Sequence, residues 1–78
     1  MKIVFDLQKR AETLRQRGLD FLDAPNVFAG ACFTFGDERF AYSEPRYITI
    51  GLLGGRMVVL VWTPDAEIDG EGCRRIIS

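Results

Sequence analysis

The feature that most constrains the fold is a pair of apolar, β-branched segments on either side of two adjacent glycines. Residues 46–53 read Arg-Tyr-Ile-Thr-Ile-Gly-Leu-Leu, and residues 56–63 read Arg-Met-Val-Val-Leu-Val-Trp-Thr. The intervening pair, Gly54-Gly55, favours a two-residue turn because such turns require positive φ at their central positions. The sequence therefore predicts an antiparallel β-hairpin at the centre of the domain.

Two helices are predicted before this hairpin. The first runs from Leu7 to Arg17, with Asp6 as its N-cap and Gly18 in the left-handed position that ends it. A second, short helix covers residues 23–28 and carries Pro25 in its first turn. The apolar residues of the first helix fall on one stripe, formed by Leu7, Ala11 and Leu14.

The remaining segments complete an α+β domain. Short strands are expected at residues 2–5, 31–35 and 74–77, and residues 40–42 begin a strand that Ser43-Glu44-Pro45 interrupts. Pro64 ends the second hairpin strand, and residues 65–72 form an acidic loop. The predicted order is β-α-α-β-β-β-β. This is one domain over residues 1–78, with the N-terminal strand and two short helices packed on a four-stranded antiparallel meander.

The second hairpin strand predicts a face that the chain itself does not cover. Residues 57–61 are apolar at every position, so both faces of this strand require cover, and two helices bury only one. A further helix beyond Ser78, a partner protein or a second copy covers the other face, or the twisted sheet covers itself. The predicted partner interface comprises Met57, Val59, Val61 and Trp62, with a place in the core as the alternative for Trp62.

Composition narrows the possible chemistry. The chain has no histidine, so imidazole acid–base catalysis and histidine-ligated metals are excluded, and no metal site or cofactor is expected. Cys32 and Cys73 fit no metal-ligand spacing and are interpreted as two reduced thiols in the core. No apolar run approaches the roughly 20 residues that span a bilayer, and no signal peptide is evident, so a cytoplasmic protein without membrane contact is expected.

Charge is distributed unevenly along the chain. The formal net charge is −1, but four acids fall within residues 65–71, and the rest of the chain holds ten basic and seven acidic residues. Outside those four acids the balance is thus 10 − 7 = +3. A modest basic face is therefore possible, although it is weaker than that of a dedicated RNA-binding domain.

Several ordered segments resemble the BrnT family of type II toxins. They are Met1–Asp6, Lys9, Gly18–Phe21, Val27-Phe28, Glu44–Gly51, Gly55-Arg56, Val58–Thr63 and Arg75–Ser78. The resemblance implies a RelE-like fold and a ribonuclease that slows translation. It also implies a cognate antitoxin protein as partner, with a homodimer or a toxin–antitoxin hetero-oligomer as the assembly. The chain departs from the family pattern at Gln16-Arg17, where the family often has Lys-His, and at Pro64-Asp65, where it usually has a basic residue.

The residues that carry this resemblance suit metal-independent RNA cleavage. Arginine grips phosphate oxygens bidentately, and Arg46 and Arg75 converge on one phosphate if their strands are neighbours. Glu44 then serves as the base for the 2′-hydroxyl or orients an arginine, and Lys9 adds a phosphate contact. The predicted catalytic residues are therefore Glu44, Arg46 and Arg75, and the predicted RNA-binding residues are Lys9, Arg46 and Arg75.

Simpler interpretations of the same residues stay open. Glu44 and Arg46 also fit a surface ion pair, and Lys9 a solvated helix lysine. Tyr42 and Tyr47 either stack on a base or pack against the sheet. The alternative function is a catalytically silent interaction domain, which keeps the toxin fold and binds an antitoxin-like partner through the uncovered sheet face.

Overall fold

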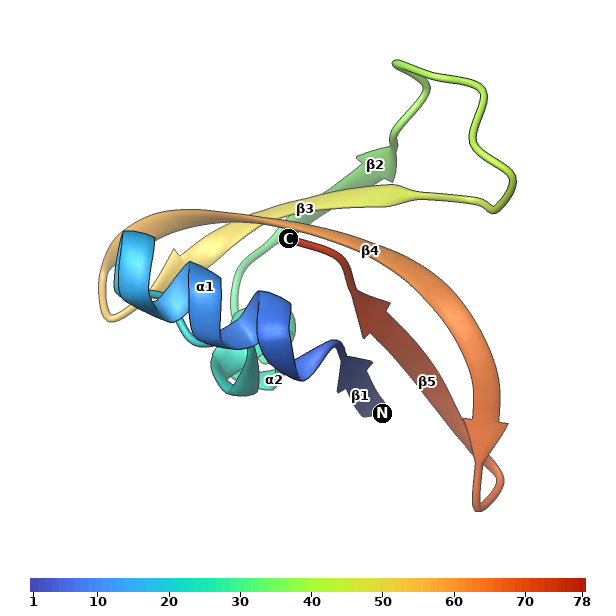
Figure 1. Ribbon diagram of the computed structural model, residues 1–78, viewed down its shortest axis with the longest axis horizontal. Helices are drawn as coiled ribbons and strands as arrows, with labels where there is room; N and C mark the ends of the chain where they lie inside the picture. The colour runs from blue at the N-terminus through green and yellow to red at the C-terminus, as the bar shows by residue number, and fades with distance from the viewer.

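A five-stranded mixed sheet carries the two helices on one of its faces (Figure 1). The computed structural model describes all residues, 1–78. In chain order the elements are β1 (Lys2–Phe5), α1 (Leu7–Arg17), the 3-10 helix η1 (Phe21–Asp23), α2 (Ala24–Ala29), β2 (Phe33–Gly36), β3 (Tyr47–Leu53), β4 (Arg56–Ile68) and β5 (Glu71–Ile76). The predicted α+β class is confirmed.

The sheet differs from the predicted four-stranded antiparallel meander because the N-terminal strand joins it as a fifth, parallel strand. The sheet order is β1-β5-β4-β3-β2, and β1 lies at the edge, parallel to β5. Strands β2 to β5 are antiparallel neighbours in chain order. β1 joins the sheet because pairing with β5 satisfies backbone groups that a strand packed on top of the sheet would leave unpaired.

The central hairpin forms as predicted. β3 pairs with β4 from Tyr47 opposite Trp62 to Leu53 opposite Arg56. Gly54 and Gly55 have φ of 57° and 76°, the two positive values that a tight hairpin turn of this type requires. The Gly-Gly pair thus fixes the register that aligns every side chain on these two strands.

The acidic segment is a second hairpin rather than the predicted loop. β4 continues through Pro64 to Ile68, and Asp69-Gly70 turn the chain into β5 with φ of 53° and 74°. Pro64 does not end the strand because β3 pairs with β4 only as far as Trp62. Beyond that point β4 has β5 as its single neighbour, so a missing N–H on the free side costs no hydrogen bond.

The segment between β2 and β3 is a loop, so the strand predicted at residues 40–42 is absent. We call residues 37–46 the β2–β3 loop; it projects from the end of the sheet in Figure 1. Its base is closed by a backbone hydrogen bond of 2.8 Å, which the Asp37 N–H donates to the Arg46 carbonyl. This bond holds the two ends of the loop together.

The core lies between the sheet and the segment that contains η1 and α2. Its buried members are Phe21, Ala24, Val27, Val58, Leu60, Trp62 and Ile76. Helix α1 contributes no buried residue, and its apolar stripe of Leu7 and Leu14 is exposed. An ion pair fastens α1 instead, since Arg10 donates two hydrogen bonds to Asp20, at 2.8 and 2.9 Å. Neither helix has the length and apolar character needed to cross a membrane.

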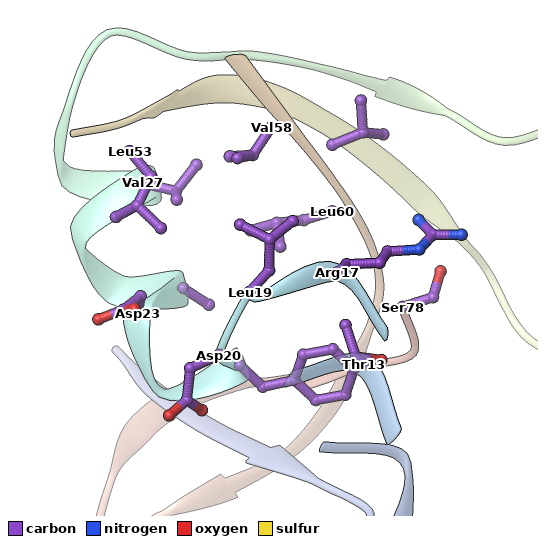
Figure 2. A pocket seen from close by; sticks show the side chains of 13 residues that line it. Thr13, Arg17, Leu19, Asp20, Asp23, Val27, Leu53, Val58, Leu60 and Ser78 are labelled. Carbon is purple, nitrogen blue, oxygen red and sulfur yellow. The ribbon is translucent and has the colours of Figure 1, made fainter. Parts of the chain in front are cut away.

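A pocket remains between α1 and the sheet (Figure 2). Thr13 and Arg17 of α1 form one wall, and Val58 and Leu60 of β4 form the opposite one. Ser78 also lines it. Helix α1 thus lies across the sheet with a pocket between them, and none of its side chains is buried.

The opposite face of the sheet, which we call the outer face, is apolar and uncovered. Met57 and Val59 are 71% and 54% exposed, while Val58 and Leu60, which point to the helices, are buried. Pairing places Ile50 and Phe33 beside Val59 on the outer face. The alternation along β4 therefore divides its apolar residues between a covered face and a bare one.

The two cysteines have different environments. Cys73 is buried on β5, as predicted, but Cys32 is exposed, so the prediction of two core thiols is wrong for Cys32. Cys32 lies in the connection that precedes β2, outside the sheet that would have buried it. Both are free thiols.

Candidate functional site

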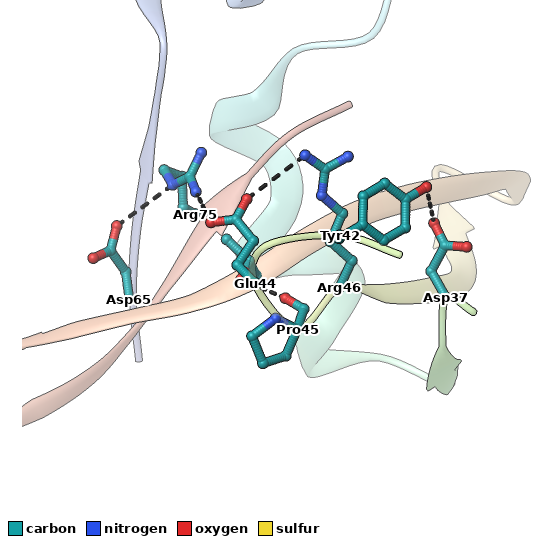
Figure 3. A network of polar contacts seen from close by, with 8 residues as sticks. Asp37, Tyr42, Glu44, Pro45, Arg46, Asp65 and Arg75 are labelled. Carbon is teal, nitrogen blue, oxygen red and sulfur yellow. Dashed lines mark hydrogen bonds and ion pairs between the residues drawn. The ribbon is translucent and has the colours of Figure 1, made fainter. Parts of the chain in front are cut away.

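One carboxylate joins the two arginines that the sequence singles out. Glu44 Oε2 lies 2.6 Å from Arg75 Nη2, and Glu44 Oε1 lies 3.6 Å from Arg46 Nη2 (Figure 3). Glu44 and Arg46 come from the β2–β3 loop and Arg75 from β5, 31 residues beyond Glu44. Glu44, Arg46 and Arg75 therefore form one cluster, which we call the Glu44 cluster. The prediction that the two arginines lie on neighbouring strands is wrong, because Arg46 precedes β3 and β4 lies between β3 and β5.

Strand pairing explains how the Glu44 cluster assembles. Arg75 lies opposite Thr63 on β4. The Thr63 hydroxyl is buried and donates a hydrogen bond of 2.5 Å to the Pro45 carbonyl. That bond ties the end of the β2–β3 loop to β4 and brings Glu44 and Arg46 to the row that holds Arg75 (Figure 3).

The Glu44 cluster is accessible to a ligand. The side chains of Glu44, Arg46 and Arg75 are 31%, 29% and 42% exposed. Partial burial of this kind strengthens electrostatic contacts above those of fully solvated ions. The charged ends are thus held in place, yet an anion from solution can reach them.

A second acid approaches Arg75. Asp65 Oδ2 lies 3.7 Å from Arg75 Nε, on the side away from Glu44 (Figure 3). Arg75 is therefore shared between two carboxylates, which lowers the net positive charge that this arginine offers to a phosphate.

Lys9 lies in a hollow next to the Glu44 cluster. The hollow is lined by Val4, Phe5, Asp6, Lys9, Arg75, Ile76 and Ile77. It lies where the parallel strands β1 and β5 end and α1 begins. Lys9 and Arg75 thus line one depression.

Arg46 is held mainly by an aromatic ring. Its guanidinium carbon lies 4.1 Å from the centre of the Tyr42 ring. Arg46 Nε is buried and has no hydrogen-bond partner. Stacking on an aromatic face fixes a guanidinium plane without using the N–H groups at its edge.

The Tyr42 ring is anchored in turn to a buried acid. The Tyr42 hydroxyl lies 3.2 Å from Asp37 Oδ2 (Figure 3). Arg39 donates two hydrogen bonds of 2.8 Å to the same carboxylate. The Arg39 guanidinium holds the pKa of Asp37 well below its usual range, although burial opposes that shift, and Asp37 raises the pKa of Arg39. Asp37 is therefore ionised throughout the physiological pH range.

The structure separates the candidate residues into groups. Glu44, Arg46 and Arg75 meet, and Lys9 shares a hollow with Arg75. Met57, Val59 and Val61 lie together on the outer face, but Trp62 does not. Its indole is buried against Phe28 and Tyr47 and donates a 2.8 Å hydrogen bond to Thr49. Trp62 thus takes the core position that was its alternative.

Sequence reasoning missed the residues that support the Glu44 cluster. Thr63 and the Asp37–Arg39 pair carried no motif of their own. The one available signal was the short spacing of Asp37, Arg39 and Tyr42 before Glu44, which suits a self-contained loop network. Tyr47, the other tyrosine considered as a site residue, stacks on Trp62 at 4.9 Å between ring centres.

The arrangement can bind a phosphate and move one proton. Two guanidinium groups stand on either side of a carboxylate that accepts hydrogen bonds. Nowhere in the molecule do three His, Cys, Asp or Glu side chains gather closely enough to hold a metal ion. Two cations beside one acceptor fit a reaction at a phosphodiester.

Comparison with known proteins agrees with this chemistry. Residues 5–78 match the sequence profile of a family described as the ribonuclease toxin BrnT of type II toxin–antitoxin systems. No match was found among the curated proteins. The profile covers nearly the whole chain, including every residue of the Glu44 cluster. The chain therefore belongs to the BrnT family of type II ribonuclease toxins.

Proposed function

We propose that the chain is a metal-independent endoribonuclease whose active site is the Glu44 cluster. The observation that carries this proposal is the shared carboxylate: Arg46 and Arg75 each contact a different oxygen of Glu44. A carboxylate that bridges two guanidinium groups occupies the kind of position that a phosphate fits, because both anions offer paired oxygens. The family membership supports RNA as the substrate.

The cleavage step follows from these groups. Glu44 accepts the proton of the ribose 2′-hydroxyl, and the 2′-oxygen attacks the adjacent phosphorus. Arg46 and Arg75 stabilise the negative charge that develops on the phosphorane oxygens. The bond from phosphorus to the 5′-oxygen breaks, and that oxygen takes a proton from water, because both arginines keep theirs. The products are a 2′,3′-cyclic phosphate and a 5′-hydroxyl end.

Binding of the remaining RNA involves Lys9. The hollow that Lys9 and Arg75 line lies beside the Glu44 cluster, so Lys9 is placed for a neighbouring phosphate of the same strand. A lysine at this position contributes affinity rather than sequence preference. The expected biological result is RNA cleavage in the cytoplasm that slows translation, held in check by a protein antitoxin.

The test is cleavage of a mixed RNA substrate by the purified protein in EDTA. We expect cyclic-phosphate ends and a fall in rate of about 100-fold or more for Arg46→Ala and for Glu44→Gln. Arg15→Ala is the matched control, because Arg15 lies on exposed α1 away from the cluster. Intact RNA after incubation with folded wild-type protein contradicts the proposal.

A second candidate function rests on the outer face. Met57 and Val59 are largely exposed, and Asp65 reduces the positive charge at Arg75. These features suit a catalytically silent domain that binds an antitoxin-like partner through the outer face. Expression of the chain without a partner separates the two candidates. Growth arrest that Arg46→Ala abolishes supports the ribonuclease, and normal growth supports the silent domain.

A further inference from the structure

We propose that Tyr42 is a positioning residue for Arg46, and that Asp37 and Arg39 anchor it. This inference rests on the proposed ribonuclease function, since it explains how one arginine of that site is held. It gives the β2–β3 loop the task of positioning Arg46. Neither the strand pairing nor the core requires this loop.

The way in which Arg46 is held distinguishes it from Arg10 and Arg39. Arg10 and Arg39 each donate from Nε and Nη2 to one carboxylate at 2.8–2.9 Å, so their binding edges are occupied. Arg46 instead lies over the Tyr42 ring at 4.1 Å, and its nearest acid, Glu44, is 3.6 Å away. The ring holds the plane of the guanidinium and leaves its terminal Nη groups free for phosphate oxygens, while Nε is buried.

The Tyr42 ring can do this only if it is itself fixed. Its hydroxyl contacts Asp37, whose side chain is fully buried. Arg39 holds both oxygens of that carboxylate, and the Asp37 N–H donates to the Arg46 carbonyl. Asp37 therefore contacts Arg46 in two ways. It donates a backbone hydrogen bond to the Arg46 carbonyl, and it holds the Tyr42 ring on which the Arg46 side chain lies.

The packing argues against a purely structural part for Tyr42. It is half-buried and does not belong to the core cluster or to the partly buried residues packed on it. The aromatic neighbour of Tyr42 is Phe40, which is itself exposed, and the two ring centres lie 5.8 Å apart. Removal of the ring therefore releases Arg46 rather than opening the core.

The test compares Tyr42→Leu and Tyr42→Phe with the matched control Phe40→Leu, which removes an aromatic side chain from the same loop but not from Arg46. For Tyr42→Leu we expect kcat to fall about 10-fold with little change in KM, because a displaced arginine loses transition-state contacts. Tyr42→Phe keeps the stacked ring and should fall about 3-fold or less, since only the hydroxyl anchor is lost. Phe40→Leu should keep the wild-type rate.

The Arg46→Ala background separates positioning from a general effect on the fold. Once Arg46 is absent, Tyr42→Leu should produce no further loss of rate, because the two changes remove the same interaction. If Tyr42→Leu lowers the rate by the same factor with and without Arg46, the inference is overturned. Thermal unfolding of each variant, measured in parallel, shows whether the loop change has altered the fold.

A spectroscopic measurement keeps the inference separate from the ribonuclease proposal. Stacking on Tyr42 should shift the Arg46 Nε–H proton resonance through the ring current, and the spectrum of Arg46→Lys identifies that resonance. We expect the shift in wild type and Tyr42→Phe and its collapse in Tyr42→Leu. If wild type leaves RNA intact but this pattern holds, the ribonuclease proposal fails and the positioning stands. If the Arg46 resonance does not move in Tyr42→Leu, the proposed role of Tyr42 in positioning Arg46 is overturned.

Discussion

At the scale of single residues, the arginines differ in how far their hydrogen-bonding edges are already occupied. Arg10 and Arg39 are held bidentately by acids that lie 10 and 2 residues away along the chain. Arg74 lies over the Trp62 and Phe28 rings, at 4.1 and 4.6 Å. Arg46 and Arg75 meet only through Glu44, which lies 31 residues from Arg75. Spacing along the chain can indicate the ion pairs of Arg10 and Arg39. It cannot indicate the contact between Glu44 and Arg75, which depends on the fold.

Thr63 should matter to both stability and activity. Thr63→Val keeps the shape of the buried side chain but removes the donor to the Pro45 carbonyl, so the free energy of unfolding should fall by about 1 kcal/mol, the net value of a typical hydrogen bond. The rate of RNA cleavage should fall as well, because the segment with Glu44 and Arg46 loses its tie to β4.

Urea unfolding and the EDTA cleavage assay measure these two effects. Thr13→Val on α1 is the matched control, since Thr13 lines the pocket under α1 and lies away from the Glu44 cluster. Equal unfolding free energies for wild type and Thr63→Val speak against the assigned hydrogen bond.

At the scale of elements, the sequence predicts those whose signals are local. The Asp6 cap and Gly18 end of α1 and the Gly54-Gly55 turn are confirmed, because each depends on side chains or φ angles within a few residues. The continuation of β4 through Pro64 was missed, because it depends on where β3 stops. That the apolar stripe of α1 stays exposed depends on tertiary packing, which helical periodicity does not report.

The close approach of α2 to β3 gives a stability prediction. A Cβ at Gly51 would lie 2.7 Å from Val27 Cγ1 and 3.2 Å from Cys32 Cβ. Gly51→Ala should therefore lower the free energy of unfolding by about 1–3 kcal/mol through overpacking. In a Val27→Ala background the same change should cost less, because the clashing methyl is gone. Gly36→Ala is the control, since a Cβ there meets nothing within 4 Å. Denaturant unfolding measures these free energies. If the losses from Gly51→Ala and Val27→Ala simply add in the double variant, the contact between residues 27 and 51 is contradicted.

The attachment of α1 gives a prediction about pH. The Arg10 guanidinium, helped by the Leu22 N–H, lowers the pKa of Asp20 from 3.8 to about 2. A lowered folded-state pKa means that this contribution is complete above pH 3.8 and is lost as the pH falls towards 2. The difference in unfolding free energy between wild type and Asp20→Asn should shrink over that interval. Asp23→Asn is the control, because Asp23 forms no side-chain cap. A difference that is constant with pH contradicts the assignment.

At the scale of the whole molecule, the sheet has one covered face and one bare face. The helices and core cover one face, and the outer face presents apolar side chains that include Met57 and Val59. The Glu44 cluster lies beyond the apolar part of the sheet, where Arg75 of β5 meets the β2–β3 loop. The mixed strand order was beyond sequence reasoning, because β1 finds its partner across almost the full length of the chain. A likeness to RelE-like toxins stays a prediction.

Substitution on the outer face should affect partner binding and leave catalysis intact. A lysine at Val59 places a charge in the predicted partner interface on the outer face, so Val59→Lys should weaken antitoxin binding by about 10-fold or more. The rate of RNA cleavage should not change. Leu22→Lys, at another exposed apolar residue, is the matched control. Isothermal titration gives the affinities, and wild-type affinity for Val59→Lys would remove the outer face as the antitoxin site.

The most direct test of the Glu44 cluster is the cleavage rate of an RNA substrate with one scissile phosphate, measured in EDTA for wild type, Arg46→Ala, Arg75→Ala and the double variant. If both arginines act on that phosphate, each single change should lower kcat by about 100-fold or more. The double variant should then lose less than the product of the two factors, because groups that act as a unit are not additive. Wild-type rates in either single variant, or independent losses that multiply, would contradict a shared site.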